Sequence, residues 1–125
     1  MAKILIVEDI TTSMMVISRL VESTGHLAIT AKDAEVGLHI ADTQQVDLIL
    51  MDLNLPGMDG FQATRLLKSN PMTATIPVIA LTAMTRKEDE RNALAAGCDA
   101  YIAKHDHSES LFTTINSLLV KRNVH

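Results

Sequence analysis

The apolar run Leu48–Met51 ends abruptly at a carboxylate, Asp52, and a Pro56-Gly57 turn and a second glycine, Gly60, follow closely. An apolar run of four residues bounded by turn signals is typical of a short strand that is buried on both faces. Asp52 is therefore expected where a buried strand meets solvent, at the edge of an open α/β sheet where ligands bind. Aspartate is also common in turns, so this position alone does not identify a site.

Short apolar runs alternate with amphipathic stretches along the whole chain. The predicted strands are Lys3–Val7, Leu27–Ala31, Asp47–Met51, Ile76–Leu81 and Ala100–Ala103. The first predicted helix begins within Ile10–Ser13, a stretch that offers several N-caps, and runs to about Ser23, and the second runs from the Asp33 cap through Ala41. The third runs from Gly60 to about Ser69 with Ala63, Leu66 and Leu67 inward. The last two run from about Arg86 to Ala96 and from a cap at Asp106 or Ser108 through Leu119.

This alternation predicts a doubly wound α/β fold: a five-stranded parallel sheet covered by five helices, of the flavodoxin-like class, with right-handed crossovers. The 125 residues suit one domain, so we expect a single domain over 1–125 without an output domain. Cys98 is the only cysteine, which excludes an internal disulfide and favours a small buried residue.

Composition excludes several classes of protein. A hydrophobic content of 47% is too high for a disordered chain. The net charge of −4 argues against direct nucleic-acid binding, which usually needs a basic surface. Because no apolar run reaches the length of a membrane span and none looks like an export signal, we expect no membrane insertion and a cytoplasmic location.

Polar residues directly follow four of the predicted strands. They are Glu8, Asp9, Asp52, Thr82 and Lys104. Parallel strands share one carboxyl-terminal edge, and a strand order of 2-1-3-4-5 would make these four strand ends neighbours, with the carboxylates at the switch point. Three carboxylates in one crevice would repel each other and raise their pKa values, and a divalent cation would remove that repulsion. Oxygen ligands without sulfur or imidazole favour Mg²⁺ or Mn²⁺.

Lys104 and the hydroxyl of Thr82 would complete a cradle for a phosphoryl group, one as a point charge and the other as a neutral donor. Phosphoryl transfer requires mainly positioning and charge neutralisation, with Asp52 as the nucleophile that forms an aspartyl phosphate. Each residue alone has an ordinary explanation as a turn residue, a cap or a surface charge. Their joint placement at four strand ends favours a site.

The chain resembles the receiver domains of two-component response regulators over nearly all of its length, in particular stand-alone members of the chemotaxis and cell-cycle type. The residues that carry this resemblance are Ile6-Val7-Glu8-Asp9, Asp52 with Pro56–Gly60, Pro77–Ala83, Ala96-Gly97 and Lys104. The strand order 2-1-3-4-5 is partly an implication of this resemblance rather than of spacing alone.

The resemblance implies that Asp52 accepts a phosphoryl group from a sensor histidine kinase or a His-containing phosphotransfer protein. Asp9 and Asp52 would ligate Mg²⁺ directly. Asn54 would do so through its backbone carbonyl, and Glu8 largely through water.

It also implies that Thr82, the Ala83 backbone N–H and Lys104 hold the phosphoryl oxygens. Thr82 and Tyr101 would move on phosphorylation and reshape the face built by the fourth helix, fifth strand and fifth helix, although Tyr101 could instead be a fixed core aromatic. Such a protein is a switch and not an enzyme, with slow self-dephosphorylation. It would signal to a separate protein, and the kinase, target and oligomeric state stay open.

One position departs from the family pattern, because His105 replaces the proline that usually follows the site lysine. A non-proline cis bond costs about 3–4 kcal/mol, so we expect a trans Lys104–His105 bond and a different loop path. His105 and His107, with Asp106, are better interpreted as solvated loop residues than as a metal cluster. Met84, like Asn54, flanks the site and is expected to tune hydrolysis.

Three other functions compete with this hypothesis. A flavodoxin-like nucleotide or flavin binder would use Thr11–Ser13 as a phosphate cradle, but Glu8 and Asp9 would repel the anion, and three aromatic residues are few for stacking a flavin. A phosphatase of the dehalogenase type would need an acid where Asn54 stands. A phosphorylation-independent interaction module on the same fold would not require the complete set of acids.

Overall fold

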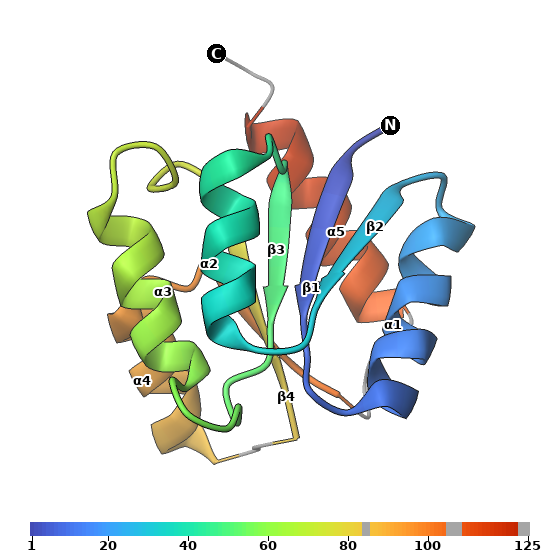
Figure 1. Ribbon diagram of the computed structural model, residues 1–125. Helices are drawn as coiled ribbons and strands as arrows, with labels where there is room; N and C mark the ends of the chain where they lie inside the picture. Colours follow the sequence, from blue (N-terminus) through green and yellow to red (C-terminus); the bar gives the residue numbers. More distant parts are fainter. Residues whose placement is uncertain (84–85, 105–108, 123–125) are drawn as a thin grey trace.

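The computed structural model describes residues 1–83, 86–104 and 109–122. They form a five-stranded parallel sheet with helices on both faces (Figure 1). The strands are β1 (Lys3–Val7), β2 (Leu27–Ala31), β3 (Leu48–Met51), β4 (Val78–Thr82) and β5 (Ala100–Ala103). Their order is β2-β1-β3-β4-β5, so the predicted fold class and strand order are confirmed.

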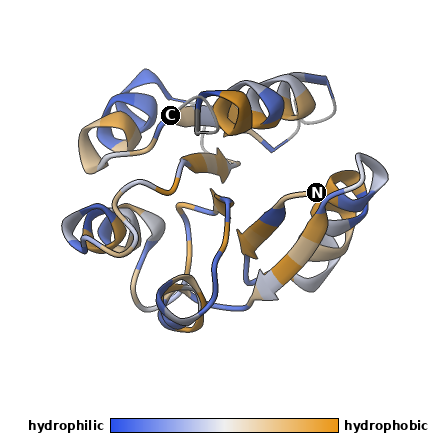
Figure 2. Ribbon diagram, turned by 90° about the horizontal axis from the view of Figure 1, so that it is seen from above, coloured by the Kyte–Doolittle hydropathy of each residue, from blue (hydrophilic) through white to orange (hydrophobic). Residues whose placement is uncertain are grey.

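The helices are α1 (Thr11–Ser23), α2 (Ala34–Thr43), α3 (Gly60–Ser69), α4 (Lys87–Ala96) and α5 (Glu109–Arg122). Alternate strand residues face opposite sides of the sheet. Leu5 and Val7 pack with α2, α3 and α4, whereas Ile4 and Ile6 pack with α1 and α5. Figure 2 shows hydrophobic strands between helices that carry both hydrophobic and hydrophilic residues. The sheet is therefore the middle of three layers, as its continuous apolar strands predict.

Backbone hydrogen bonds fix the carboxyl-terminal edge of the sheet, which lies at the bottom of Figure 1. The Glu8 N–H donates to Ala31 O at 3.0 Å, and the Asp52 N–H donates to Val7 O at 3.0 Å. The first bond joins the end of β1 to β2, and the second holds the ends of β1 and β3 side by side one residue beyond their last paired positions. Among the described residues, none of the helices combines the length and apolarity that crossing a bilayer would need.

α1 starts within the predicted stretch, but the side-chain cap expected there is absent. The helix begins at Thr11, and its N-cap is Ile10, which makes no side-chain capping hydrogen bond. The Ile10 carbonyl already accepts from Met14 N at 2.9 Å, so the helix starts directly after the acidic residues, before a side-chain cap is available. The Asp33 cap of α2 is confirmed, since its Oδ1 accepts from Val36 N at 2.9 Å.

The predicted limits of the fourth strand are wrong. β4 begins at Val78, because Ile76 N is engaged in a turn to Thr73 O at 3.0 Å. It ends at Thr82, which pairs with Ala103 of β5, so Thr82 is the last residue of the strand and not part of the loop. The third strand starts one residue later than predicted, at Leu48.

In α3, the predicted inward position of Leu66 is wrong: Leu66 is 45% exposed, whereas Thr64 is fully buried. The sheet-facing stripe is Gly60, Ala63, Thr64 and Leu67, which follows the i, i+3, i+4, i+7 spacing of one helical face. The buried position predicted for Cys98 is confirmed. The predictions for Met84, for His105, Asp106 and His107, and for a cap at Ser108 lie outside the described residues.

Candidate functional site

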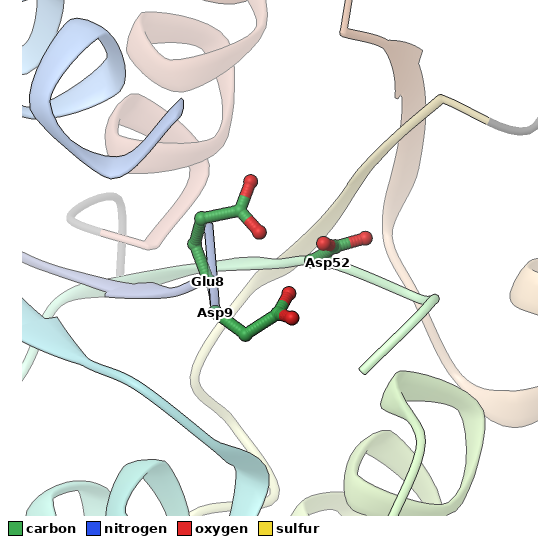
Figure 3. Close-up of side chains that lie close together, drawn as sticks. All are labelled: Glu8, Asp9 and Asp52. Atoms are coloured by element: carbon green, nitrogen blue, oxygen red, sulfur yellow. The ribbon is translucent and has the colours of Figure 1, made fainter. Parts of the chain in front are cut away.

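Three acidic side chains meet at the carboxyl-terminal edge of the sheet. Glu8 and Asp9 follow β1, and Asp52 follows β3. One carboxylate oxygen of each lies within 4.8 Å of the others, and Figure 3 shows the three carboxylates gathered in one place. Glu8 and Asp52 are 1% and 4% exposed, whereas Asp9 is exposed. The structure therefore brings together the acids that the sequence placed at neighbouring strand ends.

Lys104, which directly follows β5, supplies the positive charge of this cluster. Its Nζ forms ion pairs with Glu8 Oε1 and, at 3.1 Å, with Asp52 Oδ2. Its backbone N–H donates to Thr82 O at 2.7 Å, which fixes the start of the segment after β5 against the end of β4. The lysine thus spans from the β4–β5 side of the edge to the acids on β1 and β3.

The two carboxylate oxygens of Asp52 have different partners. Oδ1 accepts from the backbone N–H of Asn54 at 3.0 Å, and Oδ2 accepts from Lys104 Nζ at 3.1 Å. The Asn54 side chain itself is exposed. These contacts orient the carboxylate so that Oδ2 faces the lysine.

Burial and neighbouring charges set the protonation of the cluster. Burial raises the pKa of Glu8, and its hydrogen bond and repulsion with Asp52 add to that rise, whereas the Lys104 ammonium opposes it. Burial alone would lower the pKa of Lys104, but the Glu8 and Asp52 carboxylates raise it overall. In the part of the chain that the structure describes, the Lys104 ammonium pairs with two of the three clustered acids, so negative charge is in excess there.

These residues fit a hard divalent cation. The three carboxylates offer only oxygen donors, which suit Mg²⁺ or Mn²⁺. Oε1 of Glu8 is buried and has the Lys104 ammonium as an ion-pair partner but no well-oriented hydrogen bond. This oxygen therefore retains capacity to accept from a water or a cation held between the acids.

The raised pKa of Glu8 predicts how the metal-free protein responds to pH. A carboxyl whose folded-state pKa exceeds its unfolded-state value stabilises the fold below the unfolded pKa, and that contribution is lost as pH rises through the folded pKa. We expect Glu8→Gln to remove this loss, so that its melting temperature in a chelator rises relative to wild type as pH increases from about 4 to 7. The measurement is thermal unfolding across that range, and two parallel pH profiles would contradict the expectation.

The remaining predicted residues lie on β4 and β5 or directly after β4. Thr82 is fully buried at the end of β4, and Ala83 follows it. Tyr101 lies on β5, half-buried against the core on the α2, α3 and α4 side. Burial raises the pKa of Tyr101, and the negative charges of Asp89 and Glu90 on α4 add to the rise. Tyr101 packs against the same core cluster as Ala93 of α4.

Sequence reasoning missed how closely Gly60 approaches Asp52. A Cβ on Gly60 would lie 2.3 Å from Asp52 O and 2.7 Å from Leu53 Cα. The first residue of α3 therefore lies directly against the backbone that carries the Asp52 side chain, and only glycine fits there. The signal in the sequence was the Asp59-Gly60 pair, in which Asp59 caps α3 by accepting from Gln62 N at 2.9 Å.

Comparison with known proteins places this geometry in a family. The profile of the response regulator receiver domain matches residues 4–116. The protein PilH of Pseudomonas aeruginosa is 37% identical over 119 residues, which cover 95% of this chain and 98% of PilH. The polar-differentiation response regulator DivK of Brucella anthropi is 37% identical over 116 residues, which cover 93% of this chain and 94% of DivK.

Solved structures agree with these sequence matches. The receiver domain of the sensor histidine kinase PA1611 of Pseudomonas aeruginosa, solved with a magnesium ion coordinated in its active-site cleft, superposes with a TM-score of 0.89 at 33% identity, covering 95% of this chain and 98% of that one. The chemotaxis protein CheY4 of Vibrio cholerae superposes with a TM-score of 0.87 at 27% identity, covering 94% and 98% of the two chains. The chain therefore belongs to the response regulator receiver domain family of two-component signalling.

Proposed function

We propose that this chain is a phosphorylation-activated switch in which Asp52 accepts a phosphoryl group from a phosphohistidine in a Mg²⁺-dependent reaction. The observation that carries the proposal is the arrangement of the Asp52 carboxylate, which is buried beside two further acids and has one oxygen facing Lys104. Mg²⁺ would be held by Asp9, by Asp52 and by the Asn54 carbonyl, with Glu8 acting largely through water.

The chemistry is an in-line displacement at phosphorus. The Asp52 oxygen forms the new P–O bond while the P–N bond of the phosphohistidine breaks, and the imidazole leaves with the bonding electron pair. Bound Mg²⁺ would neutralise charge on the transferred oxygens and offset repulsion among the acids. Lys104, the Thr82 hydroxyl and the Ala83 N–H would bind the phosphoryl oxygens on the chain's own side of the site.

The signal would leave the site through the face formed by α4, β5 and α5. Thr82 is the last residue of β4 and Tyr101 is on the adjacent strand, so a shift of Thr82 toward a phosphoryl group bears directly on β5. Phosphorylation would replace the single negative charge of the Asp52 carboxylate by the two charges of an acyl phosphate, a net change of about −1, beside the Lys104 ammonium. The switch needs only a bias between two packings of this face.

Family membership guides the choice of partners. We infer that a sensor histidine kinase or a His-containing phosphotransfer protein donates the phosphoryl group, and that a separate protein reads the α4, β5 and α5 face. In this proposal residues 1–125 act as a single receiver domain in the cytoplasm, without direct nucleic-acid binding. Slow self-dephosphorylation would end the signal.

Tyrosine fluorescence tests the proposal directly, because the chain has one tyrosine, Tyr101, and no tryptophan. We expect Mg²⁺ with beryllofluoride, or with acetyl phosphate, to change the emission of Tyr101, and a chelator to abolish the change. Intact-mass spectrometry after treatment with acetyl phosphate should show one added phosphoryl group. Unchanged emission together with unchanged mass would contradict the proposal and favour a phosphorylation-independent interaction module.

A further inference from the structure

Thr64 is a fully buried hydroxyl residue on α3, outside the carboxylate cluster. Its Oγ1 donates to Gly60 O at 2.8 Å, one helical turn earlier, and accepts from Cys98 Sγ at 3.7 Å. A threonine hydroxyl has one proton to donate and two lone pairs, so both contacts are satisfied at once. The hydroxyl therefore links the first turn of α3 to Cys98, which lies two positions before β5.

The first turn of α3 lies against the backbone of the candidate phosphoacceptor. The Gly60 N–H donates to Leu53 O at 3.1 Å, and the absence of a side chain on Gly60 lets it approach the Asp52 carbonyl directly. Close-packed backbone contacts transmit displacement, because nothing compressible lies between them. A shift or rotation of this turn would therefore displace the backbone at Asp52 and Leu53.

The other end of α3 is attached to the same α4–β5 junction. Lys68 Nζ donates to Asp99 Oδ2 at 3.1 Å and to Ile76 O at 2.8 Å. Asp99 Oδ2 also accepts from Val78 N at 2.8 Å, which ties this contact to the start of β4. Lys68 thus holds the C-terminal half of α3, and the Thr64–Cys98 contact adds a second link, between the N-terminal half of α3 and the segment before β5.

We propose that Thr64 is a positioning residue for Asp52: its hydroxyl, held between Cys98 and Gly60, fixes the first turn of α3 against the backbone that carries the reacting carboxylate. This inference rests on the proposed role of Asp52 as phosphoacceptor. Valine has nearly the same shape as threonine, so packing alone does not require the hydroxyl in this buried position. Group transfer is sensitive to small displacements of the nucleophile, which gives the hydroxyl a measurable effect.

The test compares Thr64→Val, which removes the hydroxyl, with Thr64→Ser, which keeps it. We expect Thr64→Val to lower the maximal rate of phosphorylation by acetyl phosphate about tenfold at saturating Mg²⁺, with the KM for the donor unchanged. Thr64→Ser should stay within about twofold of wild type, since the hydroxyl is retained. Thr73→Val is the matched control, because Thr73 is also fully buried, lies in the turn after the C-terminal end of α3, and donates its hydroxyl to Leu67 O at 2.7 Å.

A second readout does not depend on phosphorylation. Cys98 is the only cysteine and is 5% exposed, so its reaction with Ellman's reagent reports how often the contact opens. We expect Thr64→Val to accelerate this reaction several-fold and Thr64→Ser and Thr73→Val to leave it slow.

Equal phosphorylation rates in wild type and Thr64→Val would overturn the inference. Equal losses in the valine and serine variants would also overturn it, because serine keeps the hydroxyl, so a shared loss would come from altered packing of the side chain and not from the hydroxyl. If the wild-type protein takes up no phosphoryl group, the proposed function fails and the positioning role fails with it, while the thiol rates still decide whether the hydroxyl holds α3 to Cys98.

Discussion

Asp52→Asn is expected to reduce phosphorylation by acetyl phosphate to background, a loss of at least about 100-fold. The substitution replaces a carboxylate oxygen by an amide nitrogen and leaves no nucleophile at the position that faces Lys104. The amide oxygen can still accept from the Asn54 N–H, as Oδ1 does at 3.0 Å in the native chain. The loss should therefore reflect chemistry and not a rearranged loop.

The measurement is intact-mass spectrometry after incubation with acetyl phosphate and Mg²⁺. Asp59→Asn is a suitable control, because Asp59 is an exposed acid near the site that caps α3 and is not one of the clustered carboxylates. We expect it to be labelled like wild type. Continued labelling of Asp52→Asn would place the acceptor on another residue.

Much of the fold was predictable because the sheet is parallel and buried on both faces. Such strands appear in the sequence as continuous apolar runs. Turn residues or charged residues mark where the runs end. The topology then brings the strand ends to one edge, so Glu8, Asp9, Asp52 and Lys104 could be grouped before any distance was known. The strand order was helped by the family resemblance.

What the sequence did not show depends on exact packing. The amphipathic pattern of α3 favoured Leu66 as an inward residue, because leucine is apolar, and it gave no reason to bury Thr64. The hydroxyl is buried because Gly60 and Cys98 satisfy it, and those partners come from different parts of the chain. Side-chain hydrogen bonds between distant segments leave no periodic signal.

The sequence also assigned Lys104 only to a phosphoryl group, whereas in the structure it already neutralises two acids. Whether a lysine at a strand end reaches across the sheet edge depends on the distance between β5 and β1. That distance follows from the strand order and the sheet twist. It cannot be calculated from the number of residues between the strands in the sequence. The lysine thus has a role in the metal-free protein that the pattern of residues could not indicate.

Lys104→Met is expected to destabilise the metal-free protein by about 3 kcal/mol, because it leaves the buried Glu8 and Asp52 carboxylates without their cation. The raised pKa of Lys104 means that its stabilising effect is complete below its unfolded pKa and is lost only as pH rises through the folded value. The full effect is therefore present at neutral pH. For a chain of this size it corresponds to a fall in melting temperature of about 10 °C.

Mg²⁺ distinguishes this effect from a general loss of packing. A divalent cation among the acids would replace the missing charge, so we expect Mg²⁺ to restore most of the lost stability of Lys104→Met and to bind this variant at least as tightly as wild type.

Lys68→Met is the matched control, because Lys68 pairs with Asp99 away from the carboxylate cluster. The stability that this variant loses should be the same in Mg²⁺ and in chelator. The Tyr101 response to beryllofluoride should be lost in Lys104→Met although Mg²⁺ still binds, since the ammonium that pairs with Asp52 is then missing. A severe loss of Mg²⁺ affinity would instead mean that Lys104 builds the metal site, and an unaltered melting temperature in chelator would mean that the acids do not depend on it.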